Sequence, residues 1–597
     1  MYRSSAKWVL LGVATVLPAL ATGQSAKAPA DYVFRNGYVY TVDKGDSVQQ
    51  AVAVREGRIV YVGNDAGAGS FVGAKTVSID LKGRMMMPGL VDGHVHPVGG
   101  GAQLRTCSLQ YLPLTQDQFL QRIQACLDQS KGGPDEFLQV TGWYRQFMQP
   151  AGADADAALL DRLKTTRPII VANRDGHQQL VNSRALALAG ITEQTPNPPG
   201  GSIDRDARGK ATGILQDAAS QLVRSKLPPR TTADAVEDAR AAVKALTEHG
   251  ITTVFDAATG LEGLTAYKAL QEKGELTIRV NATGLIDASL AQDPAAAIRF
   301  LDSLRTRFDQ PAITTQPGIR MHAAKIFLDG VIQAPAQTAG LLEPYYIMIG
   351  NGEHEEWKPG THKGPVYVPG EKLNPLVLEL AKAGYDAHIH AIGDRSVDVA
   401  LNAFAYMRSQ LENSPVRSAI AHAELVDPKD YRRFAELHVV PVMSYQWAIP
   451  GPNSVTGAKN YLGPARFDRM EPMASLSAAG APLAYGSDWP VDQMNYWLAL
   501  KGGIYRAGDG RWGSSYSGTL NAEKGISREL ALRSITMNSS WEVHQEQQTG
   551  SIETGKLADL IVLDQNFMKV SEADMPNVKV LFTMVGGKVL YDDGVGH

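Results

Sequence analysis

Two histidines, His94 and His96, stand two residues apart in the stretch GLVDGHVHP, which covers residues 89–97. Apolar and small residues precede them, as in a buried strand. Side chains alternate along a strand, so residues i and i+2 face the same way. The spacing therefore favours two imidazoles on one face, which is half of the ligand set of a metal site. Two incidental histidines on a strand would give the same spacing, so the pair needs support from elsewhere.

That support comes from three residues that end later apolar runs. His390 closes DAHIHA, His422 closes SAIAH, and Asp488 follows PLAYGS. A carboxylate at this place suits two tasks, since it can bind a metal and accept a proton from an attacking water. His388 shares a face with His390, and we expect it to be a packed histidine lower in the same strand.

Lys325 lies in another run of this kind, KIFLDG. Burial lowers the pKa of a lysine, so an amine inside a crowded fold tends to be neutral. A neutral amine can react with carbon dioxide to form a carbamate, an anionic two-oxygen ligand suited to bridging two cations. A substrate-binding cation or a buried ion pair stays open as an alternative. His322, three residues earlier, would point to the opposite face, and we assign it a structural role.

Eight short apolar runs rich in β-branched residues would carry these side chains. They alternate with Ala- and Leu-rich stretches such as ADAVEDARAAVKALTEHG, which is typical of repeated βα units and a parallel sheet. Eight such units predict an α/β fold of the (β/α)8 TIM-type barrel class, whose active sites lie where the strands end. The runs begin with VDGHVH and continue at 250–257, 278–286, 319–330, 385–394, 417–425, 439–446 and 482–488.

The predicted barrel segment, residues 89–545, is longer than the ~250 residues of a typical barrel. We place the excess in two insertions after barrel strands, at about 98–249 and 340–370. Long segments at these places would shape the substrate pocket.

Both ends of the chain have a different pattern. Residues 24–88 and 546–597 contain short strands joined by tight turns, such as those at Asn36-Gly37 and Gly586-Gly587. Such turns between apolar runs are typical of β-hairpins. We expect both ends to form one small β-sandwich domain, with the barrel inserted between them.

The first 23 residues predict a cleavable signal peptide. Arg3 and Lys7 precede an apolar run, WVLLGVATVLPALA, and small residues follow it. This run is shorter than the roughly 20 residues that span a bilayer. We expect an exported protein, periplasmic or secreted, with no membrane contact after cleavage; an uncleaved anchor stays open.

Composition limits the class of protein. Hydrophobic content is 44% of 597 residues and charged content is 20%, as in soluble globular proteins. The net charge is -4 and no basic block occurs, which argues against a nucleic-acid partner. The two cysteines, Cys107 and Cys126, would pair in an oxidising compartment or stay as two separate buried thiols.

Taken together, these motifs resemble the amidohydrolase superfamily of metal-dependent hydrolases. More narrowly, the sequence is similar to the amidohydrolase family 3 branch, which includes N-substituted formamide deformylases. The resemblance extends over nearly the whole chain after the leader. The motifs that carry it are MPGLVDGHVHP, RDGHQQLVNSRAL, KIFLDG, HAIGDRSVD, GSDWPV and GSIETGKLADLIVLD.

The resemblance implies a role for each residue of the set. His94, His96 and Asp488 would bind a first metal, His390 and His422 a second, and a carboxylated Lys325 would bridge the two. Zinc is the favoured metal, with one or two ions per chain. Asp488 would be the catalytic base. We expect substrate contacts from His177, Trp143 and Trp447. The alternatives are that His177 orders its loop and that the tryptophans only pack.

The predicted reaction is hydrolysis of a non-peptide C–N bond in an amide, formamide or cyclic amide by a metal-activated water. A deaminase, dipeptidase or ester or lactone hydrolase of the same fold stays open, and so does a secreted binding protein without catalysis. A glycoside hydrolase is disfavoured, because it would need two carboxylates at the strand ends. We expect a small-molecule substrate and leave homo-oligomerisation open.

Overall fold

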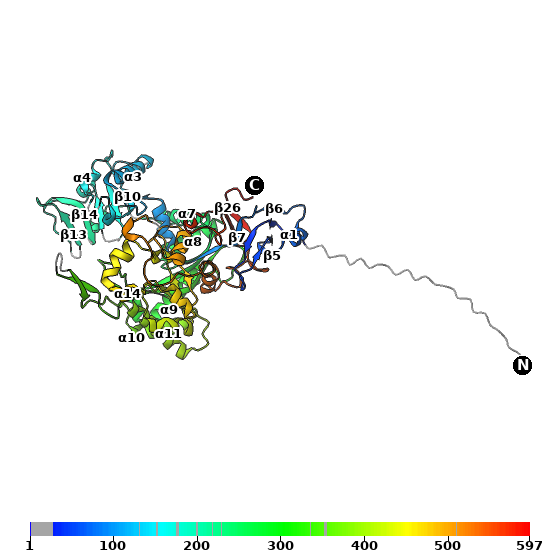
Figure 1. The fold of residues 1–597 in the computed structure, drawn as a ribbon. Helices are drawn as coiled ribbons and strands as arrows, with labels where there is room; N and C mark the ends of the chain where they lie inside the picture. Colours follow the sequence, from blue (N-terminus) through cyan, green and yellow to red (C-terminus); the bar gives the residue numbers. More distant parts are fainter. Residues whose placement is uncertain are drawn as a thin grey trace.

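The computed structural model describes Met1 and residues 28–596, except 131, 151–152, 175–177, 199–200, 218, 229, 335, 351–354 and 509. Apart from Met1, the expected leader at 1–23 lies outside the described residues. Three parts are visible in Figure 1: a central barrel, a β module formed near both chain ends, and an inserted subdomain that carries α3, α4 and β10.

Eight parallel strands form the barrel, which confirms the predicted fold class. Their order in the sheet follows the order in the chain. Beyond the last strand, backbone hydrogen bonds from Asp488 N to His94 O (2.8 Å) and from His96 N to Trp489 O (2.9 Å) join it to the first. The strands are β8 (Leu90–Val95), β15 (Ile251–Asp256), β16 (Arg279–Ile286), β17 (Ile319–Phe327), β20 (Asp386–Ala391), β21 (Ala419–His422), β22 (Val440–Met443) and β23 (Ala484–Tyr485).

Amphipathic helices surround the strands, and α7 (Thr232–Glu248) illustrates why they form. Thr231 and Asp234 make a capping box at its start. Its buried residues, among them Ala235, Ala239 and Leu246, recur at helical spacing and face the core. The other helices include α8 (Leu261–Glu272), α9 (Pro294–Phe308), α10 (Gly370–Lys382), α11 (Asp394–Gln410), α12 (Tyr431–Glu436), α15 (Met473–Ala478), α16 (Tyr496–Tyr505) and α17 (Arg528–Arg533).

A short helix, α18 (Ser539–Glu542), and the residues after it fill the bottom of the barrel. Val543 packs inside against Val91, Phe255 and Ala323, which come from three different strands. Trp541 packs against a second set of strand residues. We call residues 539–545 the plug segment.

Two sheets form the predicted β-sandwich, one from the N-terminal segment alone and one from strands of both chain ends. Phe34 of one sheet packs edge-on against Phe582 of the other, with ring centroids 5.7 Å apart, inside a shared core. One sheet has the order β5 (Arg58–Gly63), β4 (Ala51–Arg55), β1 (Tyr32–Arg35), β6 (Val77–Asp80). The other has the order β26 (Lys588–Asp592), β25 (Val580–Val585), β24 (Leu560–Leu563), β7 (Met85–Pro88), β2 (Tyr38–Tyr40), β3 (Val48–Gln49).

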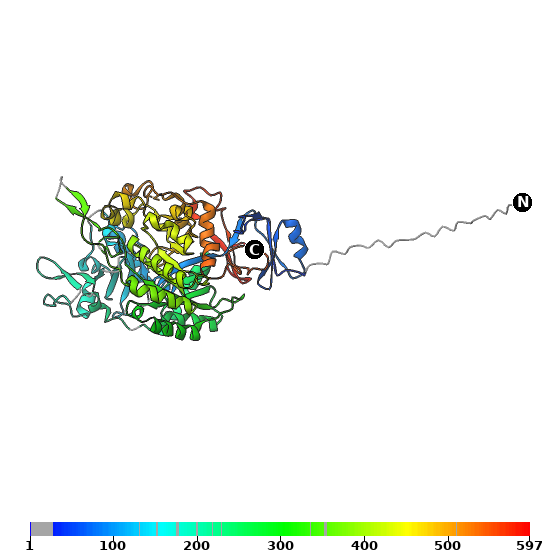
Figure 2. The same ribbon diagram turned by 90° about the horizontal axis from the view of Figure 1, so that it is seen from below.

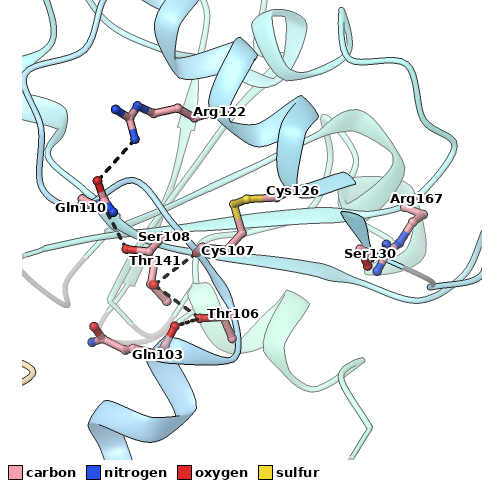
Figure 3. Close-up of a disulfide and its surroundings, with 10 residues drawn as sticks. All are labelled: Gln103, Thr106, Cys107, Ser108, Gln110, Arg122, Cys126, Ser130, Thr141 and Arg167. Carbon is pink, nitrogen blue, oxygen red and sulfur yellow. Dashed lines mark hydrogen bonds between the residues drawn. A yellow bond between two sulfur atoms is a disulfide. The ribbon is translucent and has the colours of Figure 1, made fainter. Parts of the chain in front are cut away.

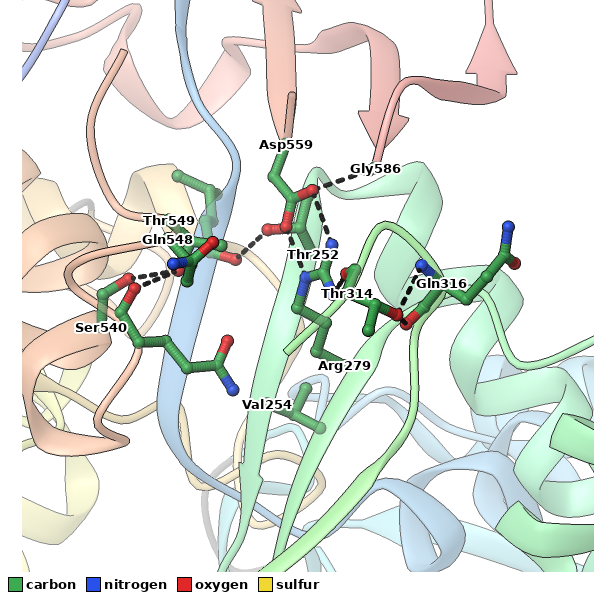
Figure 4. A network of polar contacts seen from close by, with 12 residues as sticks. Thr252, Val254, Arg279, Thr314, Gln316, Ser540, Gln548, Thr549, Asp559 and Gly586 are labelled. Atoms are coloured by element: carbon green, nitrogen blue, oxygen red, sulfur yellow. Dashed lines mark hydrogen bonds and ion pairs between the residues drawn. The ribbon is translucent and has the colours of Figure 1, made fainter. Parts of the chain in front are cut away.

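A buried ion pair joins the sandwich to the barrel (Figure 4). Arg279, at the start of β16, donates to both carboxylate oxygens of Asp559, at 2.8 and 3.1 Å. Asp559 stands just before β24 and also accepts the N–H of Gly586 at 2.7 Å. Two parallel hydrogen bonds of this kind fix the relative orientation of the two side chains and also pair their charges.

The insertion after β8 is a subdomain with its own six-stranded sheet and its own core. It is shorter than the expected span of 98–249, because α2 (Pro97–Leu104) and α7 pack against each other beside the barrel. The sheet order is β13 (Gly201–Arg205), β14 (Ala211–Asp217), β12 (Gln178–Val181), β11 (Ile169–Asn173), β10 (Leu138–Trp143), β9 (Cys107–Ser108). Its helices are α3 (Gln116–Gln129), α4 (Ala157–Leu160), α5 (Ser183–Leu188) and α6 (Ser220–Arg224).

A disulfide between Cys107 and Cys126 holds this subdomain together, which decides between the two alternatives for the cysteines. It joins β9 to α3, as Figure 3 shows. The subdomain docks on the barrel mouth, because Tyr111 donates to Pro490 O (3.2 Å) and Arg174 pairs with Asp492 (3.5 Å), both on the loop after β23.

The second expected insertion, 340–370, contains a hairpin of β18 (Tyr346–Ile349) and β19 (Glu356–Pro359). Figure 2 shows it projecting from the body of the molecule. Among the helices of the described residues, none has the length and apolar character that a membrane crossing requires.

Candidate metal centre

The six predicted ligands come from five strands of one barrel and lie at the same end of it. His94 is in β8 and His96 follows that strand, while Lys325 is near the end of β17. His390 is in β20, and His422 is the last residue of β21. Asp488 follows β23 by three residues. Parallel strands end at one edge of a barrel, so the topology gathers these side chains at its mouth.

His94, His96 and Asp488 form the tightest group. Oδ1 of Asp488 lies 3.4 Å from Nε2 of His94 and 3.2 Å from Nε2 of His96. The side chain of His94 is buried, whereas that of His96 is 27% exposed. The two histidines therefore do point the same way, as the i, i+2 spacing predicts, and both reach one carboxylate.

Glycine permits the close approach of the first and last strands. A Cβ on Gly486 would lie 2.4 Å from Cβ of His94, which no real pair of atoms tolerates. Asp92 adds a polar tie, since its carboxylate accepts the N–H of Ser487 (2.9 Å) and the hydroxyl of Tyr496 (2.9 Å). Burial raises the pKa of Asp92 to about 6, against the effect of these hydrogen bonds.

Lys325 is fully buried among the histidines. Its Nζ lies 3.4 Å from Nε2 of His94 and 4.7 Å from the centre of the Phe327 ring. Burial lowers the pKa of this amine to about 7, and the negative charge of Asp488 only partly opposes the effect. A large share of the amine is therefore neutral near physiological pH.

His390 and His422 form the other half of the set, with ring centroids 4.6 Å apart. Nε2 of His390 lies 3.0 Å from the carbonyl oxygen of Gly330, so this nitrogen carries the proton and Nδ1 keeps a lone pair. Trp447 stacks on His422 at 5.2 Å. His422 is 4.8 Å from His94, which connects the two halves.

Two of the six residues have a strained backbone. His422 has φ of 78° and Asp488 has φ of 54°. Left-handed conformations of residues other than glycine cost free energy and concentrate at functional sites. The surrounding structure therefore holds both residues in a backbone conformation that their local sequence disfavours.

The charge pattern favours neutral ligands around one carboxylate. Burial lowers the pKa of His94 and His422 well below the usual value, and nearby positive groups lower it further. The same causes lower the pKa of His390 to about 3. Burial would raise the pKa of Asp488, but the hydrogen bond with His96 and nearby positive charge outweigh it, so that pKa lies below its usual value. Neutral imidazoles and an ionised carboxylate are the forms that bind metal.

The sequence pattern of the amidohydrolase family matches residues 78–591. This chain belongs to the amidohydrolase family. Protein LONG AFTER FAR-RED 3 of Arabidopsis thaliana is 28% identical to it over 601 residues, which cover 99% of this chain and 98% of that protein. N-substituted formamide deformylase of Arthrobacter pascens is 26% identical over 576 residues, which cover 94% and 98%.

A solved structure shares the fold. It is the crystal structure of an uncharacterized metal-dependent hydrolase from Pyrococcus horikoshii, with a TM-score of 0.69 and 23% identity. The match covers 91% of this amidohydrolase and 99% of that chain. The barrel, the sandwich and the family together confirm the resemblance drawn from the motifs.

Family membership implies a hydrolase with a divalent metal, and the residues at the mouth of this amidohydrolase fit one. Donor atoms of His94, His96 and Asp488 all lie within 4.8 Å of one another. Nδ1 of His422 is buried and has no hydrogen-bond partner among the described residues. An imidazole and carboxylate donor set suits zinc and other divalent transition metals.

The three expected substrate contacts have different outcomes in the amidohydrolase structure. Trp447 lies at the site, stacked on His422. Trp143 is buried in the core of the inserted subdomain, 5.8 Å from Phe119, a position that favours packing over substrate contact. His177 lies outside the described residues.

Two residues outside the predicted ligand set lie directly beneath the site. His388 is packed lower in its strand, as expected, but its Nε2 lies 2.7 Å from Nδ1 of His94. Glu542, in the plug segment, has its Oε1 3.3 Å from Nδ1 of His388. The i, i+2 spacing from His390 indicates that His388 lies on the same face of the strand. Glu542 comes from a distant helix, and no local motif indicates its position.

A second group of histidines and a carboxylate lies at the opposite, bottom end of the barrel. His544 Nε2 is 2.7 Å from Asp386 Oδ2, and His322 Nε2 is 3.8 Å from the same oxygen. Arg417, at the start of β21, donates its backbone N–H to Asp386 at 2.7 Å. His322 thus contacts the plug segment and the strand ends, in keeping with a structural role.

Proposed function

We propose that this protein hydrolyses a non-peptide C–N bond in a small molecule, in an amide, a formamide or a cyclic amide. The observation that carries the proposal is the gathering of four imidazoles, Lys325 and the carboxylate of Asp488 at the barrel mouth. The similarity to an N-substituted formamide deformylase supports the choice of bond.

The role of Asp488 follows from its place and charge. A divalent metal held by these residues, zinc by preference and one or two ions per chain, would supply Lewis acidity toward a water and a substrate carbonyl. Asp488 is ionised, buried and hydrogen-bonded to His96, so it can accept the proton of the attacking water. The same carboxyl group can then deliver that proton to the leaving amine.

Lys325 is proposed to carry a carbamate that bridges two metal positions. The neutral share of its amine, its full burial and its contact with His94 support this role, because a bare ammonium in this place would repel a cation. A carbamate would replace that repulsion with two oxygen ligands.

Trp447 and the inserted subdomain are proposed to shape the substrate pocket. Trp447 presents an aromatic ring beside His422, and the subdomain docks on the loops that follow β22 and β23. An aromatic wall favours substrates with an apolar or planar group next to the scissile bond.

We also propose export to an oxidising compartment, with cleavage near residue 23. The charged start and apolar run of the leader support this proposal, and so does the disulfide, because such bonds persist outside reducing compartments. We propose a small-molecule substrate and no nucleic-acid partner; self-association can be measured by light scattering. N-terminal sequencing of the protein recovered from a cell fractionation tests the export proposal.

The test of the reaction is a substrate panel assayed with the purified protein before and after chelation and zinc reconstitution. The panel would contain N-substituted formamides, other amides, cyclic amides, esters, lactones, dipeptides and aminopurines. We expect turnover of a member of one of the first three classes that is lost on chelation and restored by zinc. Turnover of only an ester, a dipeptide or an aminopurine would overturn the proposed bond.

A further inference from the structure

Beneath the metal centre, three buried side chains form a line from the plug segment to a ligand. Glu542 Oε1 lies 3.3 Å from His388 Nδ1, and His388 Nε2 lies 2.7 Å from His94 Nδ1. The side chains of His388 and Glu542 are 1% and 2% exposed. The opposite nitrogen of His94, Nε2, faces Lys325 and Asp488 at 3.4 Å.

Glu542 is held there without another polar partner. Neither of its oxygens has a hydrogen-bond partner among the described residues, and the same is true of His388 Nδ1. The two groups are within ion-pair distance and bury each other. Because an unpaired buried carboxyl is costly, a hydrogen bond between His388 Nδ1 and Glu542 would stabilise both groups.

Gly93, in the GLVDGHVHP stretch, leaves room for the carboxyl group of Glu542. A Cβ on Gly93 would lie 2.5 Å from Glu542 Oε2 and 3.0 Å from the carbonyl oxygen of Tyr485. On the other side, Phe255 stacks on the His388 ring at 4.5 Å and limits its rotation. Both neighbours hold the line in one arrangement.

We propose that Glu542 and His388 are positioning residues that select the metal-binding tautomer of His94. The inference rests on the metal centre of the proposed function. A ligating Nε2 must carry a lone pair, so the proton of His94 belongs on Nδ1 and is donated to His388 Nε2. His388 then carries its own proton on Nδ1, where a Glu542 oxygen accepts it.

The opposite arrangement would block the site. If His388 carried its proton on Nε2 and donated it to His94, the proton of His94 would move to Nε2, in the position of the metal. An acceptor at Glu542 disfavours that arrangement, because the carboxylate needs a donor on His388 Nδ1. Burial raises the pKa of Glu542 well above its usual value, and a protonated carboxyl can accept through its carbonyl oxygen or donate through its hydroxyl. With a metal on Nε2 of His94 only the accepting orientation fits the line, so Glu542 stabilises the metal-bound arrangement in either protonation state.

The test measures the affinity of the chelated protein for Zn²⁺ by competition with a chromophoric chelator. Three variants are compared with the unaltered chain. Glu542→Met removes the acceptor at similar volume, Glu542→Gln keeps an acceptor oxygen, and Ser540→Ala removes a hydroxyl from the same helix without touching the line. Melting curves of the metal-free proteins report whether each variant folds.

We expect Glu542→Met to weaken zinc binding about 10- to 100-fold, the range found for lost outer-shell partners. The zinc affinities of Glu542→Gln and Ser540→Ala should stay within about threefold of that of the unaltered protein, a much smaller change than the one expected for Glu542→Met. Should Glu542→Met fail to fold, His388→Phe removes the acceptor of the His94 proton while keeping a ring against Phe255, and the same loss is expected.

Equal zinc affinity in Glu542→Met and the unaltered chain would overturn the inference while leaving the metal centre intact. An equal loss in Glu542→Gln and Glu542→Met would also overturn it, since it would make charge rather than acceptance the cause. An unaltered chain that does not bind zinc would overturn the proposed function, and this inference with it.

Discussion

The two ends of the barrel contain the same kinds of side chain in opposite electrostatic settings. At the mouth, His94, His96 and Asp488 meet a buried lysine whose pKa falls to about 7. At the bottom, His322 and His544 meet Asp386. Each group brings three metal-binding side chains together, with donor atoms within 4.8 Å of one another.

Unpaired nitrogens do not distinguish the two groups, because His422 Nδ1 at the mouth and both ring nitrogens of His322 at the bottom lack a hydrogen-bond partner among the described residues. What differs is the charge beside each group. At the bottom, Asp386 accepts from the backbone of Arg417 and from His544, and Arg417 forms a two-bond ion pair with Glu546 at 2.8 Å. Burial and the charge of Arg320 lower the pKa of His322. Guanidinium groups beside a site disfavour a cation. At the mouth the neighbouring base is Lys325, whose lowered pKa leaves much of the amine neutral, and His422 and Asp488 have a left-handed backbone.

The largest effect should come from Asp488. Asp488→Asn removes the proton acceptor and one metal ligand, so kcat should fall by a factor of about 10²–10⁴ or more. The measurement is steady-state turnover of whichever panel substrate is found, at matched zinc loading. Asp287→Asn, in the exposed loop after β16, is the matched control and should keep full turnover. A variant of Asp488 that keeps appreciable turnover would contradict its role as base.

Lys325 gives the next effect. Lys325→Ala should reduce the metal content from about two ions per chain to about one or none, because the proposed bridge is gone. Elemental analysis of the purified proteins measures this, with the exposed Lys372→Ala as control. Metal reconstitution of the unaltered chain should also depend on bicarbonate. About one ion in both proteins, without any bicarbonate effect, would favour a single-metal scheme and make Lys325 a structural or substrate-binding residue.

Much of this mouth could be predicted from sequence because its residues lie at strand ends in recurring positions. The run before His94, the i, i+2 spacing and the βα alternation depend only on local periodicity and on the rule that parallel strands end together. The eight predicted strands therefore all appear in the barrel, and the split sandwich follows from its hairpin turns.

The bottom and the plug could not be predicted in the same way. Glu542 reaches His388 only because a short helix far along the chain folds back under the barrel, and nothing in its local sequence indicates that contact. Trp143 shows the converse difficulty, since an aromatic residue near a pocket-forming motif looks the same whether it faces substrate or the core of a subdomain. The disulfide required tertiary proximity of Cys107 and Cys126, which spacing does not provide.

A smaller effect should come from His390 at the mouth, as a change of stability with pH. The folded pKa of His390, about 3, lies below its unfolded value of about 6.5, so the folded metal-free chain binds fewer protons in between. The free energy of unfolding of the metal-free chain therefore falls progressively as pH falls below about 6.5, by about 1.4 kcal/mol per pH unit. Relative to the unaltered chain, metal-free His390→Asn should gain about 2 kcal/mol between pH 7 and pH 5.

Urea unfolding of both metal-free proteins at the two pH values measures this difference. Buried carboxyls such as Asp92, whose pKa is raised to about 6, act with the opposite sign, but they are common to both proteins and cancel. A relative stability that does not change with pH would mean that His390 titrates normally in the folded chain.

The smallest effect should come from the bottom of the barrel, and it tests the contrast between the two ends. His544→Gln removes the contact with Asp386 and should cost about 0.5–1.5 kcal/mol of stability, the net worth of one typical hydrogen bond. Zinc content and turnover should stay unchanged, because the guanidinium groups of Arg320 and Arg417 beside the bottom group disfavour a cation. Elemental analysis and thermal melting measure both properties on the same sample. Loss of a metal equivalent in His544→Gln would show that the bottom group holds an ion as well, and the neighbouring arginines would then no longer distinguish the two ends.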